Sequence, residues 1–148
     1  MKNLTLAAVL ALLSVPAFAE GPGTGDIAAG EEAFGRQCVA CHVIVDDAGE
    51  ELAGRGAETG PNLYGVVGRM PGTYPDFEYG DDLIAYGELG VAWDEPTLAA
   101  YLKDPTDFLR ESLDNRRARG KMAFQVRDEQ DAYDIFAYLA SVVPAPAP

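Results

Sequence analysis

The chain has 148 residues, of which 48% are hydrophobic, and this length suits one folded domain. It carries 24 acidic and 11 basic side chains, which gives a formal net charge of -13 at pH 7. Nucleic acids and anionic membrane surfaces bind basic faces, so this acidic balance argues against both as partners.

The first residues have the pattern of a secretory signal peptide. One basic residue, Lys2, precedes an apolar run from Leu4 to Val15, and small residues at Ala17 and Ala19 complete the cleavage pattern. The run has about 12 residues, whereas a membrane-spanning helix needs roughly 20, so we expect export and no stable membrane insertion. We predict a signal peptide cleaved after Ala19 (1–19), one domain (20–143) and a flexible Pro/Ala tail (144–148).

The first predicted helix follows Asp26, whose side chain can cap its N-terminus, and runs to about Cys38. Gly30 lies inside this helix at a cost of roughly 1 kcal/mol against alanine, which predicts the close approach of another element. The best candidate is the last helix, which Asp128 opens and Pro144 ends. Its apolar residues recur at helical spacing and are Ala132, Ile135, Phe136 and Leu139.

Residues 38–42 read CVACH and contain both cysteines and the only histidine. In an oxidising compartment the cysteines could form a disulfide or a redox-active pair, but neither explains the adjacent histidine. A zinc site needs about four ligands, and no second segment offers Cys or His. The C-x-x-C-H spacing is the attachment signature of c-type haem. Cys38 and Cys41 share one face of a helical turn and can bond two vinyl groups, and His42 can bind the iron.

The middle of the chain is less regular. Segment 46–90 is rich in Gly, Pro and Asp with little periodicity, which predicts loops and turns wrapped over a ligand. Asp94 starts a helix that ends near Asp104, and segment 105–113 forms a further short helix. The predicted fold class is all-α, with about four to five helices and long loops around one covalently bound haem. The haem then replaces the missing protein core.

Two methionines are candidates for the second axial ligand of the iron. Met1 leaves with the signal peptide, while Met70 and Met122 remain. Met122 follows Cys41 by about 80 residues, after a polar loop, and could close over the opposite face of the haem. Spacing alone does not exclude Met70, and either methionine could be a core residue.

Six motifs stand in order along the chain: CVACH, TGPNLYGVVGR (59–69), Trp93 before Asp94 and Glu95, YLKDP (101–105), GKMAF (120–124) and IFAYL (135–139). The same order occurs in class I c-type cytochromes, and the chain most resembles the large bacterial cytochrome c2 group over essentially all of its mature length. This resemblance implies the class I cytochrome c fold with one covalently attached haem c. It also implies His42 and Met122, not Met70, as the axial ligands.

The resemblance also implies roles for residues around the haem. The carbonyl of Pro61 would accept the proton of the histidine ligand and fix its tautomer. Arg69, Tyr79 and Trp93 resemble donors to the buried propionate. Tyr101 resembles a hydroxyl donor near the methionine sulfur. Core packing is the alternative role for each aromatic residue, above all for Tyr79, because the segment around it differs in length from the shorter family members.

A haem with His and Met ligands has no open coordination position, and the thioether favours the ferrous state. The resemblance therefore implies a soluble periplasmic single-electron carrier, not an enzyme. Its implied donor is a quinol:cytochrome c oxidoreductase, and its acceptor is a photosynthetic reaction centre or a terminal oxidase. The alternative is a haem enzyme or sensor with a labile Met122, for which the chain has no second histidine as distal base.

Basic residues concentrate near Met122. Six basic and two acidic residues lie between Arg110 and Arg127, so this segment is expected to rim the exposed haem edge. We expect the carrier to be a monomer that docks on acidic surfaces of membrane redox complexes. The predicted docking residues are Arg116, Arg117, Arg119 and Lys121. The alternative is a solvated loop whose arginines pair with local acids.

Overall fold

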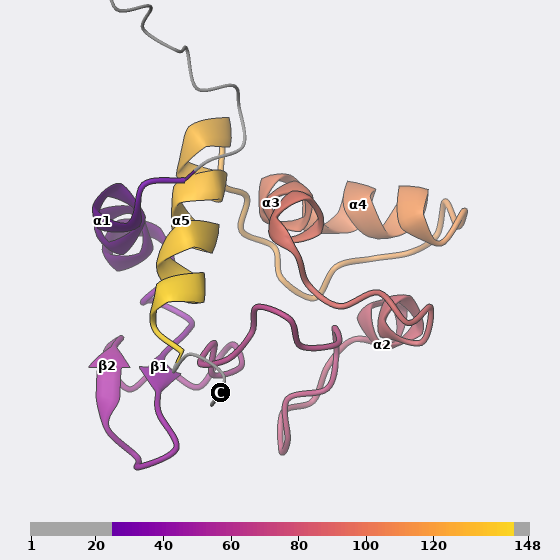
Figure 1. The fold of residues 1–148 in the computed structure, drawn as a ribbon. Coiled ribbons are helices and arrows are strands. Elements are labelled where there is room, and N and C mark those ends of the chain that lie inside the picture. The colour runs from indigo at the N-terminus through magenta and orange to yellow at the C-terminus, as the bar shows by residue number, and fades with distance from the viewer. Residues whose placement is uncertain (1–24, 144–148) are drawn as a thin grey trace, which may run out of the picture.

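The computed structural model describes residues 25–143. Its elements are, in chain order, α1 (Ile27–Gln37), β1 (Ile44–Val45), β2 (Glu51–Ala53), α2 (Asp81–Gly87), α3 (Glu95–Lys103), α4 (Pro105–Ser112) and α5 (Glu129–Ser141) (Figure 1). Helices carry almost all of the regular structure in this range, which confirms the all-α class. The predicted signal peptide (1–19), the tail (144–148) and the helix stop at Pro144 lie outside the described residues.

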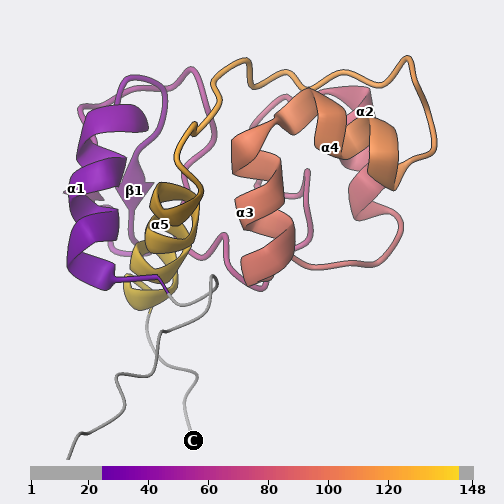
Figure 2. The same ribbon diagram turned by 90° about the horizontal axis from the view of Figure 1, so that it is seen from above.

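Helices α1 and α5 lie side by side and cross each other (Figures 1 and 2). A Cβ on Gly30 would overlap the backbone carbonyl oxygen of Asp134. The Asp134 carboxylate accepts a hydrogen bond of 2.8 Å from the backbone N–H of Asp26, the residue that caps α1. Phe34 and Tyr138 lie beside the crossing with ring centroids 5.6 Å apart. The close approach predicted from Gly30 is confirmed.

Two aspartates set the boundaries of α3 and α4. Asp94 forms a capping box with Thr97 at the start of α3. Asp104 ends α3, and its carboxylate accepts hydrogen bonds of 3.1 and 2.9 Å from the backbone N–H groups of Thr106 and Asp107. One side chain therefore closes one helix and caps the next, and both helices lie where the sequence predicts them.

The prediction of loops alone for segment 46–90 is wrong, because the segment also contains β2 and α2. β2 pairs with β1 in a short antiparallel ladder, beside which the Asn62 side chain binds the backbone of Val45 at 3.0 and 2.7 Å. α2 has only 7 residues, too few to show a helical period or to be stable alone. Tertiary packing stabilises it, since Tyr86 is buried and a Cβ on Gly87 would overlap the carbonyl oxygen of Pro71.

The remaining chain forms two long irregular connections, 54–80 between β2 and α2 and 113–128 between α4 and α5. Figure 2 shows the second connection running from α4 back to α5. Within residues 25–143, no helix has the length and apolar character needed to cross a membrane.

Candidate metal and cofactor site

A cavity of about 510 Å³ lies between the α1–α5 pair and the irregular connections. Its wall includes each side chain that the sequence or the resemblance assigned to the haem: Cys38, Cys41, His42, Pro61, Arg69, Tyr79, Trp93, Tyr101 and Met122. Buried aliphatic residues from α3 and α5 complete the wall: Leu98, Leu102, Ile135 and Leu139. Residues far apart in the sequence therefore meet around one largely apolar hollow.

Cys38 caps the C-terminus of α1 and begins the turn that carries both cysteines. The backbone N–H groups of Cys41 and His42 each donate to the carbonyl oxygen of Cys38 at 3.0 Å, so one turn of chain fixes all three side chains. No disulfide joins the two cysteines. Among residues 25–143, no three His, Cys, Asp or Glu side chains gather as a zinc site requires.

The Cys38 thiol lacks the properties of a redox-active cysteine. Burial, followed by the influence of nearby Cys41, raises the pKa of Cys38 to about 12. The attacking species in thiol–disulfide exchange is the thiolate, which a low pKa favours. The buried Cys38 therefore does not favour the thiolate that thiol–disulfide exchange requires.

Two backbone groups fix the ring of His42. Its Nδ1 donates a hydrogen bond of 2.9 Å to the carbonyl oxygen of Pro61. The backbone of Gly60 lies so close to the ring that a Cβ at this position would overlap it. Burial lowers the pKa of His42, and the Pro61 carbonyl opposes this with a smaller raising effect. The neutral ring thus leaves Nε2 available to a metal.

Both methionine candidates, Met70 and Met122, line the cavity. Met70 is half-buried in the turn before Pro71, and Met122 is half-buried in the connection between α4 and α5. Both methionines therefore border the same hollow as His42.

Arg69 is held in the wall by backbone carbonyl groups. Its Nη1 donates to the carbonyl oxygen of Tyr64 at 3.0 Å, and its Nη2 donates to that of Asn62 at 3.3 Å. The guanidinium also lies 5.0 Å from the ring centroid of Tyr74, whose hydroxyl accepts a 3.2 Å hydrogen bond from the Asn62 side chain. A fixed guanidinium in the wall suits an anionic substituent such as a propionate.

Gly60 in the wall, and Asn62 and Tyr74 against Arg69, were not predicted from the sequence. Gly60 and Asn62 flank Pro61 in the TGPN motif, so the motif itself contained the available signal. Tyr74 lies in the irregular segment without periodicity, and only the folded chain brings it to Arg69.

Trp93 and Tyr101 belong to both the core and the cavity wall. Their ring centroids are 5.1 Å apart, and both rings contact Phe108. Burial raises the pKa of Tyr101 to about 12, so its hydroxyl stays protonated and can donate a hydrogen bond. Tyr79 is half-buried; burial raises its pKa, and the charge of Arg69 opposes that rise. Trp93 and Tyr101 therefore pack in the core and also line the cavity, whereas Tyr79 lines the cavity and lies outside the core cluster.

The predicted docking residues divide into two groups. Lys121 lines the cavity, whereas Arg116, Arg117 and Arg119 are exposed on the connection after α4 and are not part of the cavity wall. The Lys121 ammonium lies 3.6 Å from a Glu78 carboxylate oxygen, on largely exposed side chains. Lys121 therefore lies at the cavity and is paired with Glu78, whereas the three arginines lie on the same loop outside the cavity wall.

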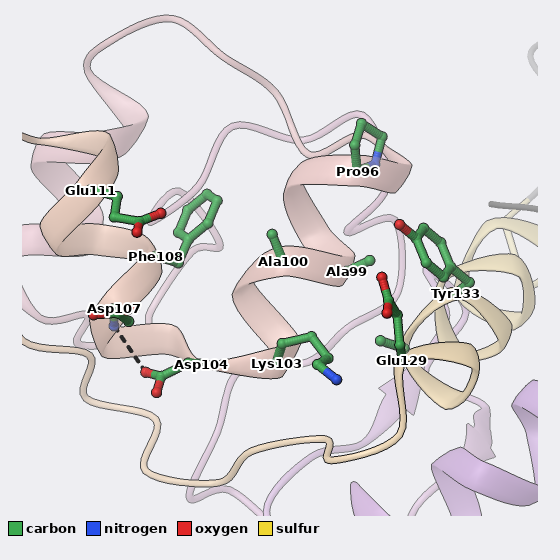
Figure 3. A pocket seen from close by; sticks show the side chains of 11 residues that line it. Pro96, Ala99, Ala100, Lys103, Asp104, Asp107, Phe108, Glu111, Glu129 and Tyr133 are labelled. Carbon is green, nitrogen blue, oxygen red and sulfur yellow. Dashed lines mark hydrogen bonds between the residues drawn. The ribbon is translucent and has the colours of Figure 1, made fainter. Parts of the chain in front are cut away.

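A second hollow, of about 350 Å³, lies between α3, α4 and α5 (Figure 3). Ala99 and Ala100 of α3 line it together with the acidic side chains of Asp107, Glu111 and Glu129. None of its lining residues carries a thiol, an imidazole or a thioether. This hollow therefore does not fit a covalently attached metal group.

The first cavity fits haem c by the chemistry of its side chains. Two thiols and one neutral imidazole come from a single turn, and thioethers come from other segments of the wall. Aliphatic and aromatic residues suit the flat apolar face of a porphyrin, and Arg69 suits its carboxylates.

Comparisons with known proteins agree with this site. No protein-family model matches the chain. Cytochrome c2 from Cereibacter sphaeroides is 50% identical over 142 residues, which are 95% of this chain and 95% of the relative. Cytochrome c-551 from Roseobacter denitrificans is 54% identical over 140 residues, which are 93% of this chain and 94% of the relative.

Solved structures give the same result. The crystal structure of cytochrome c2 from Rhodobacter sphaeroides has a TM-score of 0.79 at 51% identity, covering 82% of this chain and 99% of that one. The structure of cytochrome c2 from Paracoccus denitrificans has a TM-score of 0.73 at 38% identity, covering 79% and 95%. The chain belongs to the cytochrome c2 family of single-electron carriers, which hold one covalently attached haem c with histidine and methionine as axial ligands.

Proposed function

We propose that Cys38 and Cys41 attach the haem through thioether bonds, and that His42 and Met122 are its axial ligands. The observation that carries this proposal is the common cavity, because segments about 80 residues apart supply an imidazole and a thioether to it. The GKMAF motif favours Met122 over Met70, since this motif stands at the corresponding place in the family that the chain resembles.

The bound haem supplies an iron that exchanges one electron between the ferric and ferrous states. The residues of the chain tune and protect that exchange. Pro61 fixes the tautomer of His42 and strengthens it as a ligand. The Met122 thioether favours the ferrous state. The apolar wall excludes water and acts in the same direction, because the ferric centre carries one more positive charge.

An optical spectrum of the ferric protein tests the ligand assignment. We expect the weak red-edge absorption band of thioether ligation in the wild type, its loss in Met122→Ala, and its retention in the matched control Met70→Ala. We also expect the ferrous wild type to bind carbon monoxide poorly. Loss of the band in Met70→Ala instead, or ready binding of carbon monoxide by the wild type, would contradict the assignment.

The proposal extends to the partners. The electron comes from a quinol:cytochrome c oxidoreductase and goes to a photosynthetic reaction centre or a terminal oxidase in the periplasm. Docking uses Arg116, Arg117, Arg119 and Lys121 against an acidic surface. The exposure of all four residues supports this surface, although the Glu78 carboxylate partly neutralises Lys121. The three arginines therefore carry most of the steering.

Charge reversal tests the docking surface. We expect the double variant Arg116→Glu/Arg117→Glu to react about tenfold more slowly with an acidic membrane oxidoreductase at low ionic strength, and to lose most of the salt dependence. Arg55→Glu is the matched control, because Arg55 is also exposed but lies in the irregular segment after β2. Equal rates for the double variant and the wild type would refute this docking surface.

The predicted export route belongs to the same proposal. Cleavage after Ala19 would leave Glu20 as the first residue of the mature protein. The intact mass of protein purified from the periplasm tests this site, and a mass that retains residues 1–19 would contradict it.

A further inference from the structure

The loop that carries Met122 is held mainly by side chains. Ala118 and Val126 are both 0% exposed and form its buried ends. Their backbone N–H groups donate to the carbonyl oxygens of Asn115 at 3.0 Å and Leu102 at 2.8 Å. Between them, within the described chain, residues 119–125 make no backbone–backbone hydrogen bond to the rest of the protein. The position of this stretch therefore depends on contacts from its two neighbours, α4 and the α2 region.

The α4 side contributes fixed contacts at both ends of the stretch. The backbone N–H of Gly120 donates to the Thr106 hydroxyl at 3.0 Å. The Gln125 amide donates to the Asp104 carboxylate at 2.6 Å. A Cβ on Gly120 would lie 2.9 Å from the Cβ of Pro105, so the backbone passes directly against α4.

The α2 side holds the residues immediately before Met122. The backbone N–H of Arg119 donates to the Asp82 carboxylate at 2.8 Å. The Lys121 ammonium donates to the backbone carbonyl of Glu78 at 2.7 Å. Asp82 is half-buried in the first turn of α2, whereas its neighbour Asp81 is exposed.

Helix α2 is itself fixed to the core, so it can restrain the loop. Tyr86 of α2 is 4% exposed and makes an edge contact with Phe108 of α4 at 4.9 Å between ring centroids. It also lies 5.6 Å from the Trp93 ring in the cavity wall. A carboxylate on such a helix gives the loop a rigid point of attachment.

We propose that α2 holds the loop of residues 119–125 in place, with Asp82 as a positioning residue. By accepting the hydrogen bond from the Arg119 N–H, Asp82 keeps the Met122 thioether in the cavity. This hydrogen bond is called the clasp below. This inference rests on the proposed function, because it takes Met122 as the iron ligand. When the clasp is lost, the loop opens more often and a small ligand competes with the thioether. A hydrogen bond to a charged acceptor is stronger than a neutral one, so Asp82 contributes more than the neutral Thr106 hydroxyl.

Imidazole binding to the ferric holoprotein tests the clasp. We expect Asp82→Ala to bind imidazole about threefold to tenfold more tightly than the wild type, which corresponds to the loss of one such hydrogen bond. Asp82→Asn, which keeps an acceptor oxygen, falls between the two. Asp81→Ala is the matched control: it removes the same charge from the same helical turn, and we expect wild-type affinity for imidazole.

Thermal unfolding separates positioning from general stability. Both alanine variants remove an acid from the first turn of α2, and Asp82→Ala also loses the hydrogen bond from Arg119. We therefore expect a small decrease in Tm for Asp81→Ala and a somewhat larger one for Asp82→Ala. Equal imidazole affinity in Asp82→Ala and Asp81→Ala would overturn the clasp. So would the same increase in imidazole affinity in Asp26→Ala, which destabilises the protein at the N-cap of α1 and does not contact the loop.

The absorption band of thioether ligation distinguishes this failure from failure of the proposed function. If the wild type lacks the band, or if Met122→Ala retains it, the ligand assignment fails and the clasp fails with it. If the band is present and depends on Met122 but Asp82→Ala leaves imidazole binding unchanged, only the clasp fails.

Discussion

The α1–α5 pair and the wall of the cavity are built in different ways. At the helix crossing, Ala33, Phe34 and Ala132 are at most 1% exposed, and backbone packs on backbone at Gly30. In the wall, Arg69, Tyr79 and Met122 are only half-buried, and side-chain hydrogen bonds replace regular secondary structure. Packing of protein on protein stabilises the crossing, whereas we expect the wall to need the group that the cavity holds.

Removal of the haem is expected to have the largest effect, and to affect the wall most. The variant Cys38→Ser/Cys41→Ser cannot attach the cofactor, so the wall loses its apolar partner. We expect loss of near-UV circular dichroism and of a cooperative thermal transition, with hydrogen exchange in segment 54–80 accelerated by at least about 100-fold. A cooperative transition with native near-UV signals would show that the wall folds without haem.

Gly30→Ala breaks the crossing. Its Cβ would overlap the Asp134 carbonyl, so the helices must separate, and we expect a loss of about 3 kcal/mol in the free energy of unfolding of the holoprotein. The matched control is Gly35→Ala in the same helix, where a Cβ meets no atom within 4 Å. There we expect a gain of about 0.5–1 kcal/mol. Urea denaturation of both variants measures the difference, and equal effects would contradict the crossing.

Gly60→Ala disturbs the wall and leaves the crossing intact. The added methyl group pushes against the His42 ring, so we expect a loss of about 2 kcal/mol together with a changed haem spectrum. Gly30→Ala is expected to leave the spectrum unchanged, because no residue of the crossing binds the iron. Identical spectra for Gly60→Ala and the wild type would show that Gly60 does not orient the ring.

Asp26→Ala is expected to have the smallest effect. It removes the carboxylate that accepts the N–H of Ala29 at the start of α1, while the backbone bond from Asp26 to Asp134 can remain. Loss of an N-cap costs about 1 kcal/mol, so Tm is expected to fall by about 4 °C. Thermal circular dichroism measures this shift. A fall as large as that of Gly30→Ala would mean that the cap also maintains the crossing.

The sequence predicted much of the framework because its signals are local. Asp26, Asp94 and Asp128 mark the starts of three helices, and the structure confirms each as an N-cap. A cap acts within one turn of chain, so three or four neighbouring residues are enough to reveal it. The CVACH turn could be identified for the same reason, because its five residues are consecutive in the sequence.

Two features that were not predicted from the sequence are α2 and the contacts of Arg69, which residues outside the local helical turn stabilise. α2 depends on Pro71 and on the aromatic cluster around Tyr86, and the Arg69 site depends on Asn62 and Tyr74. None of these partners is within one helical turn of the residue that it supports. Local periodicity could therefore not find them.

The sequence by itself determined the attachment chemistry, the helix starts and the glycine at the crossing, because each depends on residue type at short spacing. Only the tertiary structure decided which contacts hold the side chains of the cavity wall in place. His42 is set by a carbonyl 19 residues away, and the loop before Met122 is set by a carboxylate 37 residues away. Such contacts form only when the whole chain folds, since their geometry is fixed by packing between elements.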